Sequence, residues 1–143
     1  MFDSATPSGN STMAKNLLRL SVFFADERYK VLSINMLRSI IDSLERYPTS
    51  FGRWASGVIS VVYPPYEIAV IGKTAASDIL PINALFLPNK IAMASVESDN
   101  FPLLEGKMAK NTEGVQSQIY VCRNYACQKP VNNFDDFLKL LSS

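Results

Sequence analysis

Histidine is absent from the 143-residue sequence. Since histidine is the usual general base and imidazole metal ligand, every Ser-His or Cys-His nucleophile pair within the chain is excluded. No apolar run approaches the roughly 18 to 20 residues that a membrane span needs. The polar opening, residues 2–12, also lacks the apolar centre of a signal peptide. We therefore expect a soluble, cytoplasmic chain that makes no contact with a membrane.

An excess of charge of either sign is missing as well. The chain has 14 basic and 13 acidic residues, which gives a net charge of +1 at pH 7. Such a balance does not favour nucleic acid as a partner. The sequence Gly72-Lys73-Thr74 is similar to the end of a phosphate-binding loop, but Glu67 replaces the upstream glycine that such a loop requires. No cofactor and no metal ion is predicted.

The composition that remains is that of an ordinary globular protein, 48% hydrophobic and about the length of one domain. Up to Pro64 the apolar residues follow helical spacing. A first helix is predicted with its cap at Asn10, Ser11 or Thr12. Its inward stripe is predicted to consist of large apolar residues, Met13, Leu17, Leu20 and Phe24.

Two further helices are predicted before Pro64. Asp26 is expected to cap the second helix, which should continue until Pro48. Ser50 is expected to cap the third helix, which the prolines at 64 and 65 end. The first two helices, joined by a short link, are predicted to form an αα-hairpin.

The periodicity changes after the double proline. Residues 67–72 form a short apolar run that ends in glycine, the pattern of a buried strand. Residues 74–87 suit a helix that Pro81 disturbs, and residues 90–95 read as a second strand. A strand, a helix and a strand in this order predict a βαβ unit with parallel strands.

The remainder of the chain is predicted to add a long loop, a third strand at residues 118–122 and a terminal helix at residues 134–141. Asn132 or Asn133 is expected to cap that helix. Its inward side chains are predicted to be Phe134, Phe137, Leu138 and Leu141.

The predicted fold class is therefore α+β. Residues 1–64 are expected to form a helical segment, and residues 65–143 a small α/β unit with a short, mainly parallel sheet.

The two cysteines, Cys122 and Cys127, are separated by four residues directly after the predicted third strand. Two thiolates alone do not complete a tetrahedral zinc site. In a reducing compartment, packed thiols are the favoured interpretation. A reversible disulfide, with Arg123 lowering the pKa of a nearby thiol, remains open, as does a metal with ligands from elsewhere.

The opening segment is rich in small polar residues and leads into a helix start, where backbone amides can bind an anion or a sugar hydroxyl. From the spacing alone, a leader followed by a helix cap is the favoured interpretation.

Two motifs carry a resemblance to a known family. They are Asp3-Ser-Ala-Thr-Pro-Ser-Gly-Asn-Ser11 and Tyr120-Val-Cys-Arg-Asn-Tyr-Ala-Cys-Gln-Lys-Pro-Val131. With residues 67–72 and 87–90 between them, they make nearly the whole chain similar to the family of spermatogenesis-associated protein 20 and its bacterial relatives. Members of that family resemble a fusion of a thioredoxin-like domain with an (α/α)6 toroid of the six-hairpin glycosidase and N-acylglucosamine 2-epimerase type.

The resemblance implies that the chain is the C-terminal part of such a protein. Its helical segment would be the last hairpins of the toroid, and its partners would be the preceding thioredoxin-like and toroid domains. In toroids of this type the loops at one end line a sugar cleft. The matching residues expected to contact a small sugar are Asp3, Ser8, Gly9 and Asn10.

Two hypotheses of function follow, of which the first is favoured and the second is the alternative. In the first, the chain forms one wall of a sugar cleft in a carbohydrate-active or carbohydrate-binding protein. In the second, it is a redox-linked interaction module that uses Cys122 and Cys127. Catalytic residues are not identified, catalysis by the chain alone is not expected, and self-association through helix faces left uncovered is expected.

Overall fold

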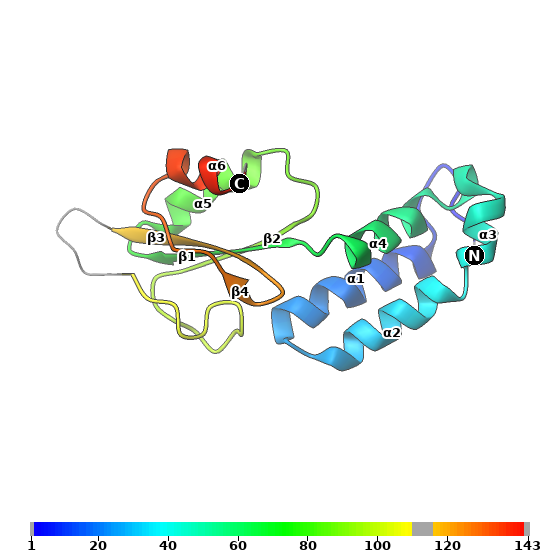
Figure 1. The fold of residues 1–143 in the computed structure, drawn as a ribbon, viewed down its shortest axis with the longest axis horizontal. Coiled ribbons are helices and arrows are strands. Elements are labelled where there is room, and N and C mark those ends of the chain that lie inside the picture. The colour runs from blue at the N-terminus through cyan, green and yellow to red at the C-terminus, as the bar shows by residue number, and fades with distance from the viewer. Residues whose placement is uncertain (1, 110–115, 142–143) are drawn as a thin grey trace. The chain divides into compact units, whose positions relative to one another are not determined.

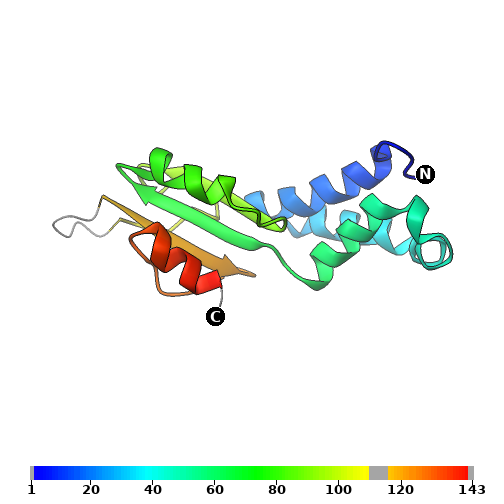
Figure 2. The ribbon, with the colours of Figure 1, turned by 90° about the horizontal axis from the view of Figure 1, so that it is seen from above.

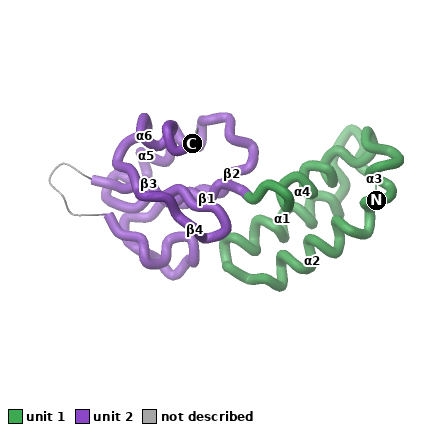
Figure 3. The backbone as a smooth tube through the Cα atoms, in the orientation of Figure 1, with its two compact units in different colours: residues 1–64 green, residues 65–143 purple. Residues whose placement is uncertain are grey.

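The computed structural model describes residues 2–109 and 116–141. The chain divides into two compact units, residues 1–64 and residues 65–143 (Figure 3). The first unit is helical and the second contains the sheet (Figure 1). The predicted α+β class, with a helical segment followed by an α/β unit, is confirmed.

The helical unit contains four α-helices and one short 3-10 helix among its described residues. They are α1 (Gly9–Phe24), α2 (Glu27–Arg38), α3 (Ile41–Arg46), η1 (Pro48–Ser50) and α4 (Gly52–Val62). Helix α1 packs against both α2 and α4. The core of the unit consists of Ala14, Leu37, Ile40, Phe51 and Trp54.

Small side chains form the buried face of α1. This face consists of Ser11, Ala14, Leu18 and Ser21, whereas Met13 and Phe24 are about half exposed. The predicted stripe of large apolar residues is therefore wrong for these two positions. The physical reason is a close approach of the helices, because the Ser33 hydroxyl of α2 donates to the Ala14 carbonyl of α1 at 2.7 Å.

The helix ends differ from the prediction in three places. Ser8, and not residues 10–12, caps α1, since its side chain accepts a hydrogen bond from the Ser11 amide. Asp26 caps α2 as predicted. That helix ends at Arg38, well before Pro48, and the turn that follows carries Ile40 into the core, where it is buried. The Ser39 hydroxyl bonds back to the Met36 carbonyl at 2.8 Å in this turn.

The start of α4 is the third difference. Ser50 lies in η1, and the residue before α4, Phe51, makes no side-chain cap. The acceptor for the first amides of α4 comes instead from Asp3, about fifty positions earlier in the chain.

Among its described residues, the second unit contains a four-stranded sheet and two helices. Its elements are β1 (Tyr66–Gly72), α5 (Ala75–Ala84), β2 (Lys90–Ser95), β3 (Ser117–Arg123), β4 (Ala126–Cys127) and α6 (Phe134–Leu141). The strand order is β2-β1-β3-β4, so that β1 lies between β2 and β3. Figure 2 shows β1, in green, beside β3, in orange. Strands β1 and β2 are parallel, which confirms the βαβ unit.

The prediction of a mainly parallel sheet is wrong. Strand β3 pairs antiparallel with β1, and β4 pairs antiparallel with β3. The reason for the second pairing is a two-residue turn at Asn124 and Tyr125, which reverses the chain directly. The short strand β4 was not predicted.

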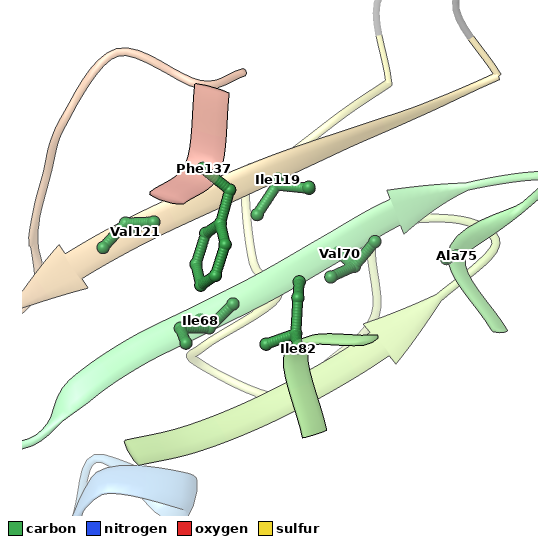
Figure 4. Close-up of a cluster of buried hydrophobic side chains, with 7 residues drawn as sticks. All are labelled: Ile68, Val70, Ala75, Ile82, Ile119, Val121 and Phe137. Carbon is green, nitrogen blue, oxygen red and sulfur yellow. The ribbon is translucent and has the colours of Figure 1, made fainter. Parts of the chain in front are cut away.

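Both helices of this unit cover the same face of the sheet (Figure 4). The shared core consists of Ile68, Val70, Ala75, Ile82, Ile119, Val121 and Phe137. Asn133 caps α6, as expected, by accepting from the Asp136 amide at 2.9 Å. Leu138 is 38% exposed, so its predicted place in the core is wrong.

Gly72 ends β1 in a conformation that only glycine adopts readily, with φ at 136°. A Cβ atom at this position would lie 2.2 Å from the carbonyl oxygen of Gln116. The glycine therefore allows β1 to end against the start of β3.

Candidate functional site

The hairpin of β3 and β4 brings the two cysteines together. Cys122 and Cys127 are register partners on these strands and form a disulfide, with their Cα atoms 3.9 Å apart. The favoured interpretation as packed free thiols is therefore wrong, and a disulfide, which the sequence left open, is what the structure contains. Cys122 is only 2% exposed, whereas Cys127 is exposed to solvent.

The turn explains why four intervening residues place the cysteines opposite each other. Asn124 and Tyr125 both have positive φ, 49° and 62°, as in the two-residue turns that match the twist of a hairpin. One further pair of residues, Arg123 and Ala126, separates the turn from the disulfide. Asn is common in this conformation and Tyr is not, so the turn is only half visible in the sequence.

Arg123 was predicted to lie near a cysteine sulfur, but its side chain is engaged elsewhere. Its guanidinium carbon is 3.9 Å from the centroid of the Tyr66 ring, a cation-π contact. Tyr66 and Arg123 each adjoin the register pair Glu67 and Cys122. Since side chains alternate between the two faces of a sheet, the guanidinium lies on the face opposite the disulfide.

A buried acid, Glu67, lies next to the disulfide. Glu67 is 2% exposed and is the register partner of Cys122 on the neighbouring strand β1. Register partners share a face of the sheet. The side chains of Glu67, Cys122 and Cys127 therefore form a row across three strands, on the face away from α5 and α6.

The carboxylate of Glu67 is held at the hairpin turn. The backbone amide of Tyr125 donates to Oε2 of Glu67 at 3.1 Å. Burial raises the pKa of Glu67, while hydrogen bonds from the amides of Tyr125 and Asn124 and the charge of Lys107 oppose that rise. Burial also lowers the pKa of Lys107, and the charge of Glu67 opposes this shift.

The segment that carries Lys107 lies over this face of the sheet. The Tyr120 hydroxyl, on the same face as Glu67, donates to the Met108 carbonyl at 2.7 Å and accepts from the Met108 amide. Leu103 and Leu104 of the same segment are buried. The charges of Glu67 and Lys107 thus interact on the face of the sheet that carries the disulfide.

Asp3, the first predicted sugar contact, has four hydrogen-bond donors from within the chain. Oδ1 accepts from the Ser8 amide at 2.8 Å and from the Ser11 hydroxyl at 2.6 Å. Oδ2 accepts from the amides of Arg53 at 2.8 Å and Trp54 at 3.3 Å. Asp3 therefore joins the first turns of α1 and α4.

These hydrogen bonds change the acidity of Asp3. Burial raises the pKa of this carboxyl, but the Ser11 hydroxyl and the three backbone amides outweigh it, and the pKa lies below its ordinary value. Ser8 is likewise engaged as the cap of α1, whereas Gly9 and Asn10 are exposed. A sugar contact by these residues stays a prediction.

A partly buried group of polar side chains joins the start of α5 to β3. The Thr74 hydroxyl donates to Asp78 Oδ2 at 2.7 Å, and Ser117 donates a short hydrogen bond to the same oxygen. This group fixes the strand-to-helix turn after Gly72. Among the residues that the structure describes, no group of three or more candidate ligands could hold a metal ion. Within the same residues, no helix has the length and hydropathy to cross a membrane.

The fold and the site define an α+β chain in which a disulfide-closed hairpin lies against a buried acid. The chain is similar, over 97% of its length, to spermatogenesis-associated protein 20 from Homo sapiens, with 26% identity, and from Rattus norvegicus, with 23% identity. The predicted resemblance to this family is confirmed. The chain spans about a fifth of the length of these curated relatives. No family model and no solved structure gives a significant match.

Proposed function

We propose that this chain is a redox-linked module of a longer protein, in which a dithiol of a thioredoxin-like partner domain opens the Cys122–Cys127 disulfide. The observation that carries this proposal is the disulfide itself, in which Cys127 is exposed and Cys122 is buried opposite an acid on the neighbouring strand. Of the two hypotheses from the sequence, this one gains direct support from geometry.

The exchange begins at the exposed sulfur. A thiolate of the partner attacks Cys127 Sγ, a mixed disulfide forms, and Cys122 leaves with the electron pair of the broken S–S bond. The second thiol of the partner then attacks its own half of the mixed disulfide and releases the Cys127 thiolate. The partner dithiol is oxidised and the two cysteines of the chain are reduced.

The proposal includes a cytoplasmic location. Disulfides are rare in that compartment, and those that form are usually transient and catalytic or redox-sensing. An exchangeable pair with one exposed sulfur fits this use.

Thiol counting in redox buffers tests the proposal. The chain is equilibrated with mixtures of reduced and oxidised dithiothreitol, trapped with an alkylating reagent and weighed. We expect both thiols to appear together within the range of cytosolic potentials. Two free thiols at every potential, or a disulfide that persists throughout, would contradict the proposal. Cys127→Ser is the control, because it leaves a single thiol that no longer depends on the buffer.

A sugar cleft is the second candidate function. It is supported by the exposure of Gly9 and Asn10 in the first turn of α1, a 16-residue helix. In the longer protein these two residues would contact the ligand, and Asp3 and Ser8 would hold them in place. Calorimetric titration of the intact protein with sugars should show weaker binding for Asn10→Ala. Unchanged binding after substitution of both Asp3 and Asn10 by alanine would contradict this function.

The helical unit is proposed to pack against the other domains of the longer protein or, without them, against a second copy. Several large apolar side chains of this unit are exposed, Phe2, Met13, Phe24, Val31, Leu32, Ile59, Val62 and Tyr63. Sedimentation of the isolated chain should reveal association that increases with concentration. A species that stays monomeric at all concentrations would argue against this part of the proposal.

A further inference from the structure

We infer that Glu67 carries the proton of the thiol exchange, giving it to Cys122 when the disulfide opens and taking it back when the disulfide closes. This inference rests on the proposed redox function and assigns a role to a residue outside the cysteine pair.

The position of Glu67 supports this role in two independent ways. Its backbone is the register partner of Cys122, so both side chains project from the same face of adjacent strands. Its carboxylate reaches the turn that joins the two cysteine-bearing strands, where Oε2 lies 3.1 Å from the amide nitrogen of Tyr125. Glu67 is therefore linked to Cys122 through the strand register and to the turn through its carboxylate.

The burial of Cys122 creates the need for a proton donor. At 2% exposure, its sulfur would leave as a thiolate largely shielded from water, and burial disfavours such a charge. Cys127 has no such need, because it is exposed. A neutral acid next to the leaving sulfur removes this cost by protonating it.

The step balances in atoms and charge. An incoming dithiol thiolate attacks Cys127 Sγ, the Sγ–Sγ bond breaks, and its electron pair goes to Cys122. The proton of neutral Glu67 moves to Cys122 Sγ, which leaves a carboxylate. The negative charge has moved from the thiolate to Glu67, where the amides of Asn124 and Tyr125 and the charge of Lys107 stabilise it. Closure of the disulfide by an oxidised partner runs the same step backwards.

The surroundings allow Glu67 to change its charge. Burial favours the neutral acid and raises its pKa, and the amides of Tyr125 and Asn124 and the charge of Lys107 limit that rise. On the other neighbouring strand, β2, the register partner of Glu67 is the apolar Ile91. Arg123 adjoins Cys122 but stacks on Tyr66 at the opposite face.

The kinetics of reduction by dithiothreitol, measured by stopped flow from pH 5 to pH 9, test the inference. Rates are divided by the fraction of dithiothreitol present as thiolate, so that only the protein contributes to the remaining pH dependence. In the wild type, we expect this normalised rate to fall as pH rises through the pKa of Glu67. In Glu67→Gln, which retains an acceptor for the Tyr125 amide but cannot release a proton, the rate should be at least about tenfold lower at low pH and nearly independent of pH.

Lys107→Met is a second variant, in which Glu67 itself is retained. Loss of the lysine charge removes a contribution that stabilises the carboxylate, so the inflection of the rate profile should move to higher pH. A purely structural role of Glu67 would not produce such a shift. Glu105→Gln, an exposed acid two residues from Lys107, is the matched control and should reproduce the wild-type profile.

The outcomes separate the two proposals. If the wild-type disulfide opens but Glu67→Gln gives the same rates and the same profile, the role of Glu67 is contradicted and the redox function stands. If wild-type Cys122 and Cys127 do not exchange with dithiothreitol at all, both are contradicted.

Discussion

In each unit of the molecule an acid joins segments that are far apart in the chain, Asp3 in one and Glu67 in the other. The surroundings shift the pKa values of these two acids in opposite directions. Asp3 in the helical unit accepts four hydrogen bonds, and its pKa is lowered. Glu67 in the sheet unit is buried, and its pKa is raised. An acid stabilised in its charged form suits a structural cap, whereas an acid held close to its neutral form suits proton transfer.

The largest effect is expected from Asp3→Ala. Helices α1 and α4 both lose an acceptor at their first turns, and the donors left behind are partly buried. We expect the helical unit to lose about 3 kcal/mol of unfolding free energy. Urea unfolding followed through the fluorescence of Trp54, the single tryptophan of the chain and a core residue of this unit, measures the change.

The control for this variant is Asp42→Ala, which removes an exposed acid in the first turn of α3. Its effect should stay within about 0.5 kcal/mol. Equal losses for the two variants would show that Asp3 is not a special cap.

The next effect concerns the sheet unit. Cys127→Ser opens a closed loop of six residues, and the loop-closure estimate for this length is about 2 kcal/mol. Hydrogen exchange of the β3 amides should become faster by a corresponding factor, roughly 30-fold. Unchanged protection in β3 would mean that the hairpin turn and the sheet hold the strand without the disulfide.

A smaller effect distinguishes the residues of the opening motif. Ser8→Ala removes the side-chain cap of α1 and should cost about 1 kcal/mol. Asn10→Ala, two residues further along the same exposed turn, should cost no more than about 0.5 kcal/mol. Thermal unfolding of the two variants measures the difference. A larger loss for Asn10 would assign that residue a structural role and weaken its use as a ligand contact.

The two acids should also respond to pH in opposite directions. The stability that Asp3 contributes is present above its unfolded pKa of 3.8 and is lost as pH falls through its lower folded value. For Glu67 the contribution of the neutral form is present below 4.5 and is lost as pH rises through its raised folded value. The unfolding free energy of Glu67→Gln should therefore rise relative to the wild type as pH increases. The deficit in unfolding free energy of Asp3→Asn relative to the wild type should shrink as pH decreases. If the difference in unfolding free energy between variant and wild type changed with pH in the same direction for Glu67→Gln and Asp3→Asn, the contrast between the two acids would be contradicted.

The sequence predicted those strands, helices and caps that are determined by residues close together in the chain. The apolar runs of β1 and β2, the terminal helix α6 and the caps at Asp26 and Asn133 were found because propensity, periodicity and capping residues agree there. The α+β class followed from the change of periodicity after Pro64.

Contacts between distant residues were the source of the errors. No local signal shows that Asp3 caps a helix that begins at Gly52, or that α1 buries its small residues to approach α2 closely. The antiparallel course of β3 depends on how the chain returns to β1, which periodicity does not report. The spacing of Cys122 and Cys127 did carry a signal, since four residues fit a two-residue turn flanked by one strand pair.

A carbon-13 NMR titration of the Glu67 carboxyl group, in the oxidised and in the reduced protein, tests most directly whether the acid and the disulfide act as one unit. We predict a pKa above the ordinary value in the oxidised form, and a titration in the reduced form that is altered by coupling to the Cys122 thiol. An ordinary pKa that is identical in the two forms would contradict the account.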